Sequence, residues 1–343
     1  MLTTSEISEL KQLLNEKLNI VITSHSNPDG DAVGSSLAMY HYLSKLGNEV
    51  NMVVPNKFPD YYNWLPDSEK IINYEKQSKS AQQILKEADL IFCVDFNAIS
   101  RLGAVADIVK NTSAKRILID HHIDPETHNF DYCYSTVETS STGELIYDFI
   151  TALGDEKLID KNISEAIYTS IVTDTGSFSF SNNRPETYVV TSKLVSLGVD
   201  AQKIHKLIYD TYSENRLRLL GFAISNRMVV WEELHTALIY LTKSDLKEFS
   251  YEVGDTEGLV NYPLTMKKIN MSVLITEKEN NLRLSFRSKG EFSVNKLARE
   301  HFNGGGHRNA AGGKSTETVE NLIDRLKQVM QNNKQNLNYR ITL

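Results

Sequence analysis

Short runs of apolar and β-branched residues alternate with helical patterns in the first half of the chain, and this alternation most constrains its fold. The strand-like runs cover residues 18–23, 49–54, 90–94 and 116–119. Between the first two, apolar residues from Val33 to Leu43 recur at helical spacing and end at Gly47. Apolar strands separated by helices are typical of parallel βαβ units. The sequence therefore predicts an α/β domain with a parallel sheet and helices on both faces.

A second domain is indicated by a change of texture near residue 203. Charged and apolar residues recur at helical spacing over 203–228, which predicts a linker helix. Beyond it lie predicted strands at 237–241, 271–275 and 282–287 and predicted helices at 294–302 and 319–330. At ~100–200 residues per domain, the chain is long enough for two. We expect a first domain over 1–202, a linker helix over 203–228, and a smaller α/β domain with a mixed sheet over 229–343.

Composition limits the partners and the location. The net charge is −7, whereas proteins that coat long duplex nucleic acid carry an excess of Lys and Arg. No run approaches the ~20 apolar residues of a membrane span, and the polar N-terminus lacks the apolar core of a signal peptide. Cys93 and Cys133 have no partner at metal-ligand spacing, so we interpret both as packing residues in a reducing compartment. We expect a cytoplasmic protein that binds neither long duplex nor membrane; a homodimer is compatible with the sequence but not required by it.

Acidic and imidazole groups gather where predicted strands end, which is where parallel sheets bind ligands. They lie in four segments, namely His25-Ser26-Asn27-Pro28-Asp29-Gly30-Asp31, Asp95, Asp120-His121-His122 and Asp174-Thr175-Gly176. Each segment alone has a structural interpretation, because Asp is common in helix caps and turns and Gly often ends helices. A helix cap explains one Asp of the first segment, but not two together with a His.

Taken together, the segments contain enough ligands for two metal ions. They offer four carboxylates and two imidazoles, from His25, Asp29, Asp31, Asp95, His121 and Asp174. This oxygen-rich set favours two divalent ions, with Mn²⁺ as the first choice and Mg²⁺ or Fe²⁺ as alternatives. Two such ions about 3.5–4 Å apart bind both the attacking and the leaving oxygen of a phosphoryl displacement.

A glycine-rich segment over residues 304–313 is the second candidate site. Its backbone N–H groups are suited to an anion-binding nest, and His307 and Arg287 add donors for phosphate. It lacks the Gly-Lys-Ser/Thr ending of a nucleotide-triphosphate P-loop. The alternative interpretation is a flexible connection between the helix at 294–302 and the next element.

These segments, in this order, resemble the DHH phosphoesterases. Gly304-Gly305-Gly306-His307 with Ala310-Ala311-Gly312 resembles the C-terminal domain that accompanies many of them. The two-domain organisation is similar to the branch that degrades nanoRNA and dephosphorylates 3′-phosphoadenosine 5′-phosphate (pAp). RecJ-like members carry more domains, and membrane-bound cyclic-dinucleotide members carry transmembrane segments.

The resemblance implies a role for each site residue. His25, Asp29 and Asp95 would hold the first metal, and Asp31, Asp95, His121 and Asp174 the second. Asp95 would bridge the two, Asp120 would support the site, and His122 would contact the scissile phosphate. Arg287, Ser288 and His307 would bind the terminal phosphate of the nucleotide, with Gly305 and Gly306 lining that site. We assign no role to residues 182–184.

The implied activity is hydrolysis of short oligoribonucleotides to mononucleotides, of pAp to AMP, or of both. A water activated by the metal pair would attack phosphorus in line. The alternative is a phosphodiesterase for linear or cyclic dinucleotides. Less favoured are a pyrophosphatase or polyphosphatase, a nucleotide sensor, and a structural protein whose acidic turns are only helix caps.

Overall fold

The computed structural model describes residues 2–180 and 183–337 and divides the chain into two compact units, Met1–Thr211 and Tyr212–Leu343. Each unit has its own sheet and its own apolar core. Across the described residues, no helix has both the length and the apolar character that crossing a membrane requires.

In the described part of the first unit, six parallel strands form one sheet, as predicted. The strands are β1 (Asn19–Thr23), β2 (Glu49–Val54), β3 (Ile71–Asn73), β4 (Leu90–Val94), β5 (Lys115–Asp120) and β6 (Tyr132–Ser135). Their order is β3-β2-β1-β4-β5-β6, so the direction of winding changes between β1 and β4. Sheets of this kind bind ligands outside the carboxyl ends of the strands at that change.

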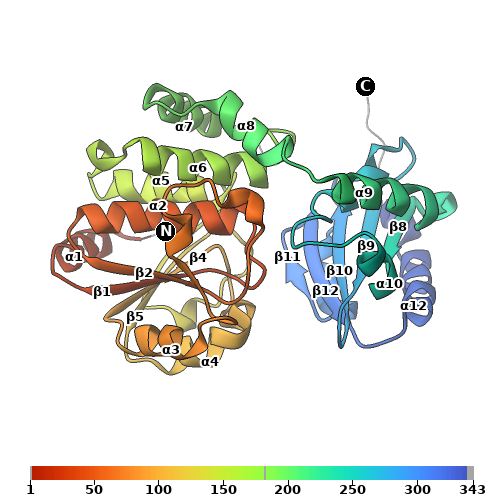
Figure 1. Ribbon diagram of the computed structural model, residues 1–343, viewed down its shortest axis with the longest axis horizontal. Coiled ribbons are helices and arrows are strands. Elements are labelled where there is room, and N and C mark those ends of the chain that lie inside the picture. The colour runs from red at the N-terminus through yellow and green to blue at the C-terminus, as the bar shows by residue number, and fades with distance from the viewer. Residues whose placement is uncertain (1, 181–182, 338–343) are drawn as a thin grey trace. The chain divides into compact units, whose positions relative to one another are not determined.

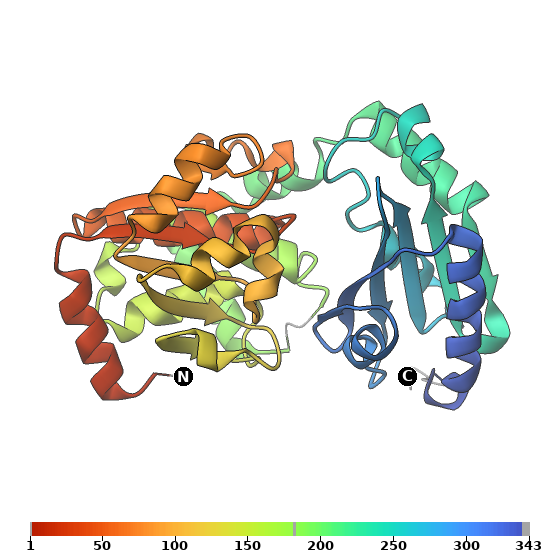
Figure 2. The ribbon, with the colours of Figure 1, turned by 90° about the horizontal axis from the view of Figure 1, so that it is seen from below.

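Helices cover both faces of this sheet (Figure 1). One face packs against α1 (Thr4–Leu14), α2 (Gly30–Lys45), α5 (Thr142–Ala152) and α6 (Lys161–Asp174). The other packs against α3 (Ser78–Lys86) and α4 (Ala106–Asn111), which lie across the sheet in Figure 2. Successive strand residues serve opposite faces, since Phe92 belongs to the first core and Ile91 and Cys93 to the second. Outside α5 and α6 lie α7 (Pro185–Ser196) and α8 (Ala201–Tyr209).

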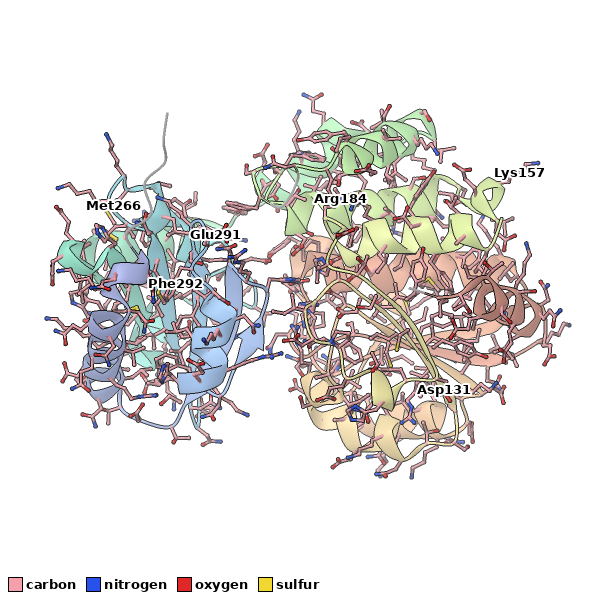
Figure 3. All side chains as sticks on the ribbon, turned by 180° about the vertical axis from the view of Figure 1, so that it is seen from behind. Asp131, Lys157, Arg184, Met266, Glu291 and Phe292 are labelled. Carbon is pink, nitrogen blue, oxygen red and sulfur yellow. The ribbon has the colours of Figure 1, made fainter. Side chains whose placement is uncertain are left out.

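The second unit contains the predicted mixed sheet, in the order β11-β12-β10-β9-β8-β7. Its strands are β7 (Met228–Trp231), β8 (Thr236–Leu241), β9 (Met271–Glu277), β10 (Leu282–Ser288), β11 (Gly305–Gly306) and β12 (Ala310–Ser315). Only β8 and β9 pair in parallel among the strands described. The helices α11 (Val294–His301) and α12 (Val319–Asn332) pack on one face, and α9 (Glu214–Asn226) and α10 (Lys243–Glu248) on the other. The loop before α11 carries Glu291 and Phe292 (Figure 3).

The predicted single linker helix over residues 203–228 is wrong, because two helices, α8 and α9, occupy this segment. Ser213 has an extended backbone, and its side chain accepts a hydrogen bond from the N–H of Arg216. That N-cap starts a new helix. Helical spacing continues on both sides of the break, so periodicity alone does not reveal it. The two units divide inside this break.

Candidate active site

The six residues predicted as metal ligands lie together at the carboxyl ends of the parallel strands. Among these six residues, two groups have ligand atoms within 4.8 Å of one another, one formed by His25, Asp29 and Asp95, the other by Asp31, Asp95 and His121. Asp174 joins the second group, with Oδ2 3.6 Å from His121 Nε2. Asp95 belongs to both groups and follows β4, directly at the change in strand order.

The His25 ring is oriented by the loop that follows β1. Its Nδ1 lies 2.9 Å from the carbonyl oxygen of Ser26, so Nδ1 carries the hydrogen and Nε2 offers a lone pair. That Nε2 lies 3.3 Å from Asp95 Oδ2 and 3.8 Å from Asp29 Oδ1. The ring therefore presents the nitrogen that a metal ion requires toward two carboxylates.

Asp29 combines the two interpretations of its segment. Its Oδ1 caps α2 by accepting from the N–H groups of Asp31 and Ala32, each at 3.1 Å, while the side chain stays 47% exposed and beside His25. Gly30 follows because a Cβ there would lie 2.4 Å from Thr173 Oγ1. The close approach of α2 to α6 sets the direction in which Asp31 enters the site.

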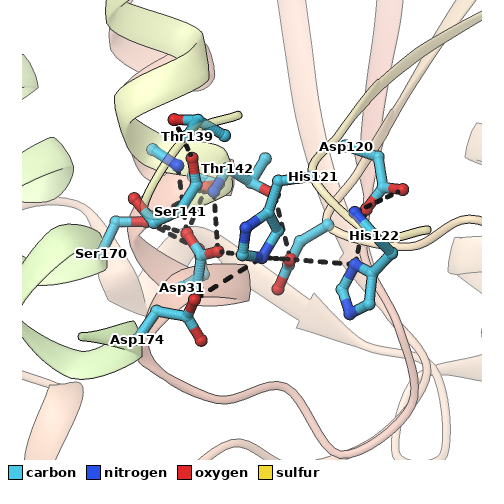
Figure 4. A network of polar contacts seen from close by, with 12 residues as sticks. Asp31, Asp120, His121, His122, Thr139, Ser141, Thr142, Ser170 and Asp174 are labelled. Carbon is cyan, nitrogen blue, oxygen red and sulfur yellow. Dashed lines mark hydrogen bonds and ion pairs between the residues drawn. The ribbon is translucent and has the colours of Figure 1, made fainter. Parts of the chain in front are cut away.

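Asp31, His121 and Asp174 form the second half of the centre (Figure 4). His121 Nε2 lies 3.5 Å from Asp31 Oδ2 and 3.7 Å from Asp95 Oδ1. Burial lowers the pKa of His121, which favours the neutral ring that binds metal ions. Asp174 ends α6, so the segment 167–173, for which the sequence left helix and strand open, is helical.

The amino end of α5 holds two of the carboxylates, and sequence reasoning missed it. The N–H groups of Thr142 and Gly143 donate to Asp31 Oδ2 and Oδ1 at 2.8 and 3.1 Å, and Thr142 Oγ1 donates to Asp95 Oδ1 at 3.0 Å (Figure 4). A helix N-terminus favours a negative charge at this position. The signal that was available is Ser141-x-x-Glu144 before an apolar helix, a sequence that predicts an N-terminus.

Two buried hydroxyl groups complete the environment of Asp31. Ser35 Oγ donates to Asp31 Oδ1 at 3.1 Å, and Ser170 Oγ donates to the same oxygen. Ser35 and Ser170 lie on α2 and α6, where single serines carry no local pattern. Ser35 lies one turn beyond Asp31 on the same helix, whereas Ser170 could be assigned only after α6 was packed against α2.

Asp120 and His122 form a pair beside the metal-competent groups. Asp120 is fully buried; its Oδ1 lies 2.7 Å from His122 Nδ1, and its Oδ2 accepts from the His122 N–H at 3.1 Å (Figure 4). Burial raises the pKa of Asp120 to about 7, and Arg101 opposes this rise. The carboxyl group fixes the tautomer and direction of the His122 ring, as its predicted supporting role requires.

The charge of the centre fits divalent cations. Burial, followed by the charges of Asp31, Asp29, Asp174 and Asp120, raises the pKa of Asp95 well above its usual range. Carboxylates this close repel one another unless a cation lies between them. The oxygen and imidazole donors suit Mn²⁺, Mg²⁺ or Fe²⁺, and the shared Asp95 suits a pair of ions.

In the second unit, the predicted phosphate-binding segment is an ordered hairpin, not a flexible connection. Gly305 and Gly306 pair with Gly312 and Ala311 of β12, and the His307 N–H donates to the Ala310 carbonyl at 2.7 Å. Arg287 pairs with Ala310 on the other side of β12, so the hairpin and Arg287 lie on adjacent strands.

Two asparagines that sequence reasoning missed hold this hairpin, the buried Asn295 and the partly buried Asn309. Asn295 Oδ1 accepts from the Gly306 N–H at 2.9 Å, and Asn309 Nδ2 donates to Ser288 Oγ at 2.9 Å. Ser288 is nearly buried, and its hydroxyl donates to the Phe292 carbonyl at 2.7 Å. To contact a phosphate, Ser288 would have to redirect that hydroxyl.

Comparison with known proteins agrees with this geometry. Residues 19–171 match the N-terminal domain of the DHH family, and residues 235–332 match the DHHA1 domain. The chain is 26% identical to the bifunctional oligoribonuclease and PAP phosphatase NrnA of Bacillus subtilis, over 89% of this chain and 92% of that protein. It is 30% identical to the protein of the same name from Thermus thermophilus, over 85% of this chain and 83% of that protein.

Solved structures share the fold. An exopolyphosphatase-related protein from Bacteroides fragilis has 41% sequence identity and a TM-score of 0.90, with 98% of both chains covered. RecJ from Thermus thermophilus, crystallised with Mn²⁺, has a TM-score of 0.57 at 13% identity and so shows a common fold alone. The order of motifs, the two matched domains and these relatives lead to one conclusion: the chain belongs to the DHH family of phosphoesterases.

Proposed function

We propose that the protein is a two-metal phosphoesterase that hydrolyses short oligoribonucleotides to mononucleotides and pAp to AMP. The observation that carries the proposal is the convergence of six metal-competent side chains around Asp95, which belongs to both groups. The proposal also draws on the two relatives named oligoribonuclease and PAP phosphatase, which align over most of both chains.

In this proposal, His25, Asp29 and Asp95 hold one divalent ion, and Asp31, Asp95, His121 and Asp174 hold the other. Mn²⁺ is the ion we favour, since the donors combine imidazole with carboxylate. When bound, such ions activate water near neutral pH and neutralise charge on the phosphoryl group. The protein contributes by holding the ligands rigidly, through the α5 amino end and the hydroxyl groups on Asp31.

His122 acts on the reacting phosphate in this proposal. Its Nδ1 is engaged by Asp120 at 2.7 Å, so Nε2 is the nitrogen that would face substrate. A hydrogen on Nε2 would stabilise negative charge as it develops on the phosphate or leaving oxygen. Asp120 would keep the ring in this orientation throughout the reaction.

The second unit binds the nucleotide in this proposal. Arg287 and His307 supply donors for its terminal phosphate, Gly305 and Gly306 allow close approach of the backbone, and Ser288 supports the hairpin through Asn309. Guanidinium groups are suited to phosphate because they donate in a fixed fork.

Short substrates and a cytoplasmic location belong to the same proposal. The net charge of −7 disfavours binding along extended nucleic acid. The two cysteines, Cys93 and Cys133, are free thiols, as suits a reducing compartment. We propose no contact with membranes or long duplex.

Two other substrate classes remain as candidates because relatives carry them in their names. The chain is 25% identical to the cyclic-di-AMP phosphodiesterase PdeA of Listeria monocytogenes, but it covers 45% of that protein. The similar Bacteroides fragilis structure is described as exopolyphosphatase-related. Cyclic dinucleotides and polyphosphate therefore belong in the substrate panel.

The experiment is a hydrolysis assay with Mn²⁺ on pAp, a series of short oligoribonucleotides, a linear and a cyclic dinucleotide, and polyphosphate. We expect mononucleotides from the short RNAs and AMP with phosphate from pAp, and neither product from Asp95→Asn. Asp89→Asn is the matched control, since Asp89 lies at the opposite end of β4 and its carboxyl group bonds only the Asn19 N–H among the contacts described. Hydrolysis of polyphosphate alone would contradict the proposal, and so would binding of nucleotide without turnover.

A further inference from the structure

We propose that Glu144 is a positioning residue, whose buried carboxyl group ties the start of α7 to the loop that holds Asp31 and Asp95. This inference rests on the metal site of the proposed function. It assigns a role to a side chain that neither the motifs nor the ligand set includes. It also gives Arg184 a function, while Asn182, which the sequence also left without a role, lies outside the described residues.

One oxygen of Glu144 gathers donors from two segments. Glu144 is fully buried in the first turn of α5. Its Oε2 accepts from the Ser140 N–H at 3.0 Å, from Ser140 Oγ at 2.5 Å and from Thr187 Oγ1 at 2.8 Å. Thr187 is fully buried in the first turn of α7, so a single carboxylate oxygen joins two helix starts.

The other oxygen faces Arg184, which immediately precedes α7 (Figure 3). Within residues 2–180 and 183–337, Glu144 Oε1 has no hydrogen-bond partner, and Arg184 Nη2 lies 3.8 Å away. Glu186 lies 3.9 Å from the same nitrogen. The charge of Arg184 offsets that of Glu144 at this distance without a direct hydrogen bond.

A buried carboxyl group with one unbonded oxygen is a poor device for stability. Removing a charged group from water is costly, and a well-packed apolar side chain is often as stabilising as a buried ion pair. Several short bonds to one oxygen do, however, fix the relative positions of the donors. The arrangement is therefore better suited to fixing the positions of these donors than to stabilising the fold.

The geometry in question is that of the metal ligands. Ser140 and Glu144 stand on either side of Thr142, and the Glu144 N–H donates to Ser141 Oγ at 3.1 Å. The loop between them is closed by these bonds. Its backbone donates to Asp31 at 2.8 and 3.1 Å, and Thr142 Oγ1 donates to Asp95 at 3.0 Å. Without the hydrogen bonds that Glu144 accepts, these donors would be able to move away from Asp31 and Asp95, the two carboxylates that bind metal.

The effect should therefore appear in metal affinity. Loss of a group that orients a metal ligand weakens metal binding by about 10–100-fold in known sites. A tie between α5 and α7 that served packing alone would instead lower thermal stability and leave metal affinity unchanged. The two roles are separated by measuring both quantities on the same variants.

The test uses the full chain stripped of metal, with Mn²⁺ binding followed by calorimetry and unfolding followed by a thermal scan, both without nucleotide. Glu144→Leu removes the carboxyl group that accepts the hydrogen bonds from Ser140 and Thr187. Because this change could prevent folding, Thr187→Val removes only one donor, and Thr187→Ser restores a hydroxyl. Thr191→Val is the matched control one turn further along α7, since Thr191 Oγ1 bonds only the carbonyl of its own helix among the contacts described.

We expect Mn²⁺ affinity to fall by about 10–100-fold in Glu144→Leu and by a smaller factor in Thr187→Val. Thr187→Ser and Thr191→Val should stay near the wild type. Affinity equal to the wild type in a folded Thr187→Val or Glu144→Leu protein would overturn the proposal, whatever its melting temperature. A wild-type protein that binds Mn²⁺ but hydrolyses no nucleotide would contradict the proposed function. The comparison of Mn²⁺ affinity among the variants would still test the role of Glu144.

Discussion

The two units present their candidate ligand-binding groups in opposite ways. In the first, the groups are the ionisable side chains of Asp31, Asp95 and His121, all nearly buried. In the second, the glycine hairpin offers mainly backbone, with Gly305 and Gly306 partly exposed. A buried carboxylate depends on compensating charge, whereas a glycine hairpin depends on the space around its backbone. Substitutions in the two units should therefore fail for different reasons.

The difference follows from the two sheets. A parallel sheet brings the ends of strands distant in sequence to one edge, so Asp95 meets residues that follow β1 and β5. The antiparallel strands β10, β11 and β12 instead bring chain neighbours face to face. The parallel arrangement brings together side chains from many segments, whereas the antiparallel arrangement brings together the backbone of a few turns.

The strongest test of the first unit, whose ligands are ionisable side chains, is replacement of Asp95, the carboxylate shared by both ligand groups. Asp95→Asn should lower hydrolysis by at least about a thousandfold, since several kcal/mol of metal-dependent stabilisation would be lost. The metal-free variant should nevertheless be more stable than the wild type, by on the order of 1 kcal/mol, because it relieves repulsion with Asp31 and Asp29. Activity assays and chemical unfolding in a chelator measure the two effects.

Asp89→Asn serves as the control for stability, since its carboxyl group accepts one backbone hydrogen bond at 2.9 Å. Its free energy of unfolding should change by less than about 1 kcal/mol, because the asparagine oxygen still accepts that bond, and it should keep its activity. If metal-free Asp95→Asn were instead less stable than the wild type, the carboxylates would be compensated by protein groups alone, and the contrast between the units would weaken.

The second unit, whose hairpin offers mainly backbone groups, is tested by adding one methyl group to a glycine of that hairpin. A Cβ at Gly304 would lie 1.9 Å from the Gly312 carbonyl oxygen, so Gly304→Ala must displace the hairpin. We expect KM for pAp to rise by about tenfold or more, equivalent to about 1.4 kcal/mol, while Mn²⁺ affinity stays unchanged. Stability should fall by about 1–3 kcal/mol.

Gly312→Ala is the matched control on the facing strand. Its Cβ would meet only the Leu284 carbonyl oxygen, at 3.7 Å, among the atoms described, which is ordinary contact. Its KM should remain within about twofold of the wild type. Equal effects of the two alanines on KM would show that the hairpin's shape is not what binds the nucleotide.

Sequence patterns predicted the first unit well where a strand ends in polar residues. The apolar runs before His25, Asp95 and Asp120 are β1, β4 and β5, and their ends meet because the sheet is parallel. The groups that support these ligands were missed. Ser170 reaches Asp31 from a second helix, and a serine inside a helix gives no sign of a partner on another helix until the two helices pack.

The second unit was harder to predict where strand pairing, and not the intrinsic preference of the residues, determines the secondary structure. The run Ala310-Ala311-Gly312-Gly313 has low intrinsic preference for a strand, yet β12 forms there because β10 pairs with it along its whole length. The same limit hid the break between α8 and α9, where a serine cap outweighs continuous helical spacing. In both places, a tertiary or capping contact decided what periodicity left open.

Asp148 tests whether burial of a carboxyl group without a metal also destabilises the first unit. It lies on α5 one turn beyond Glu144, and burial, followed by the charge of Glu144, raises its pKa from 3.8 to about 6. A raised carboxyl pKa means that the folded state binds the proton more tightly than the unfolded state. The wild type should therefore lose stability as the pH rises from about 4 to about 6, and this loss should persist at higher pH.

Asp148→Asn should remove that loss. At about pH 7.5 the variant should be more stable than the wild type by on the order of 1 kcal/mol, a value reduced because the side chain is partly exposed. Below about pH 4 the two should converge on the same denaturant midpoint, since the wild-type group is then protonated in both the folded and the unfolded state. Activity should not change. A constant difference across this pH range would mean that packing, not charge, sets the stability at this position, and that charge compensation in the first unit is confined to the metal ligands.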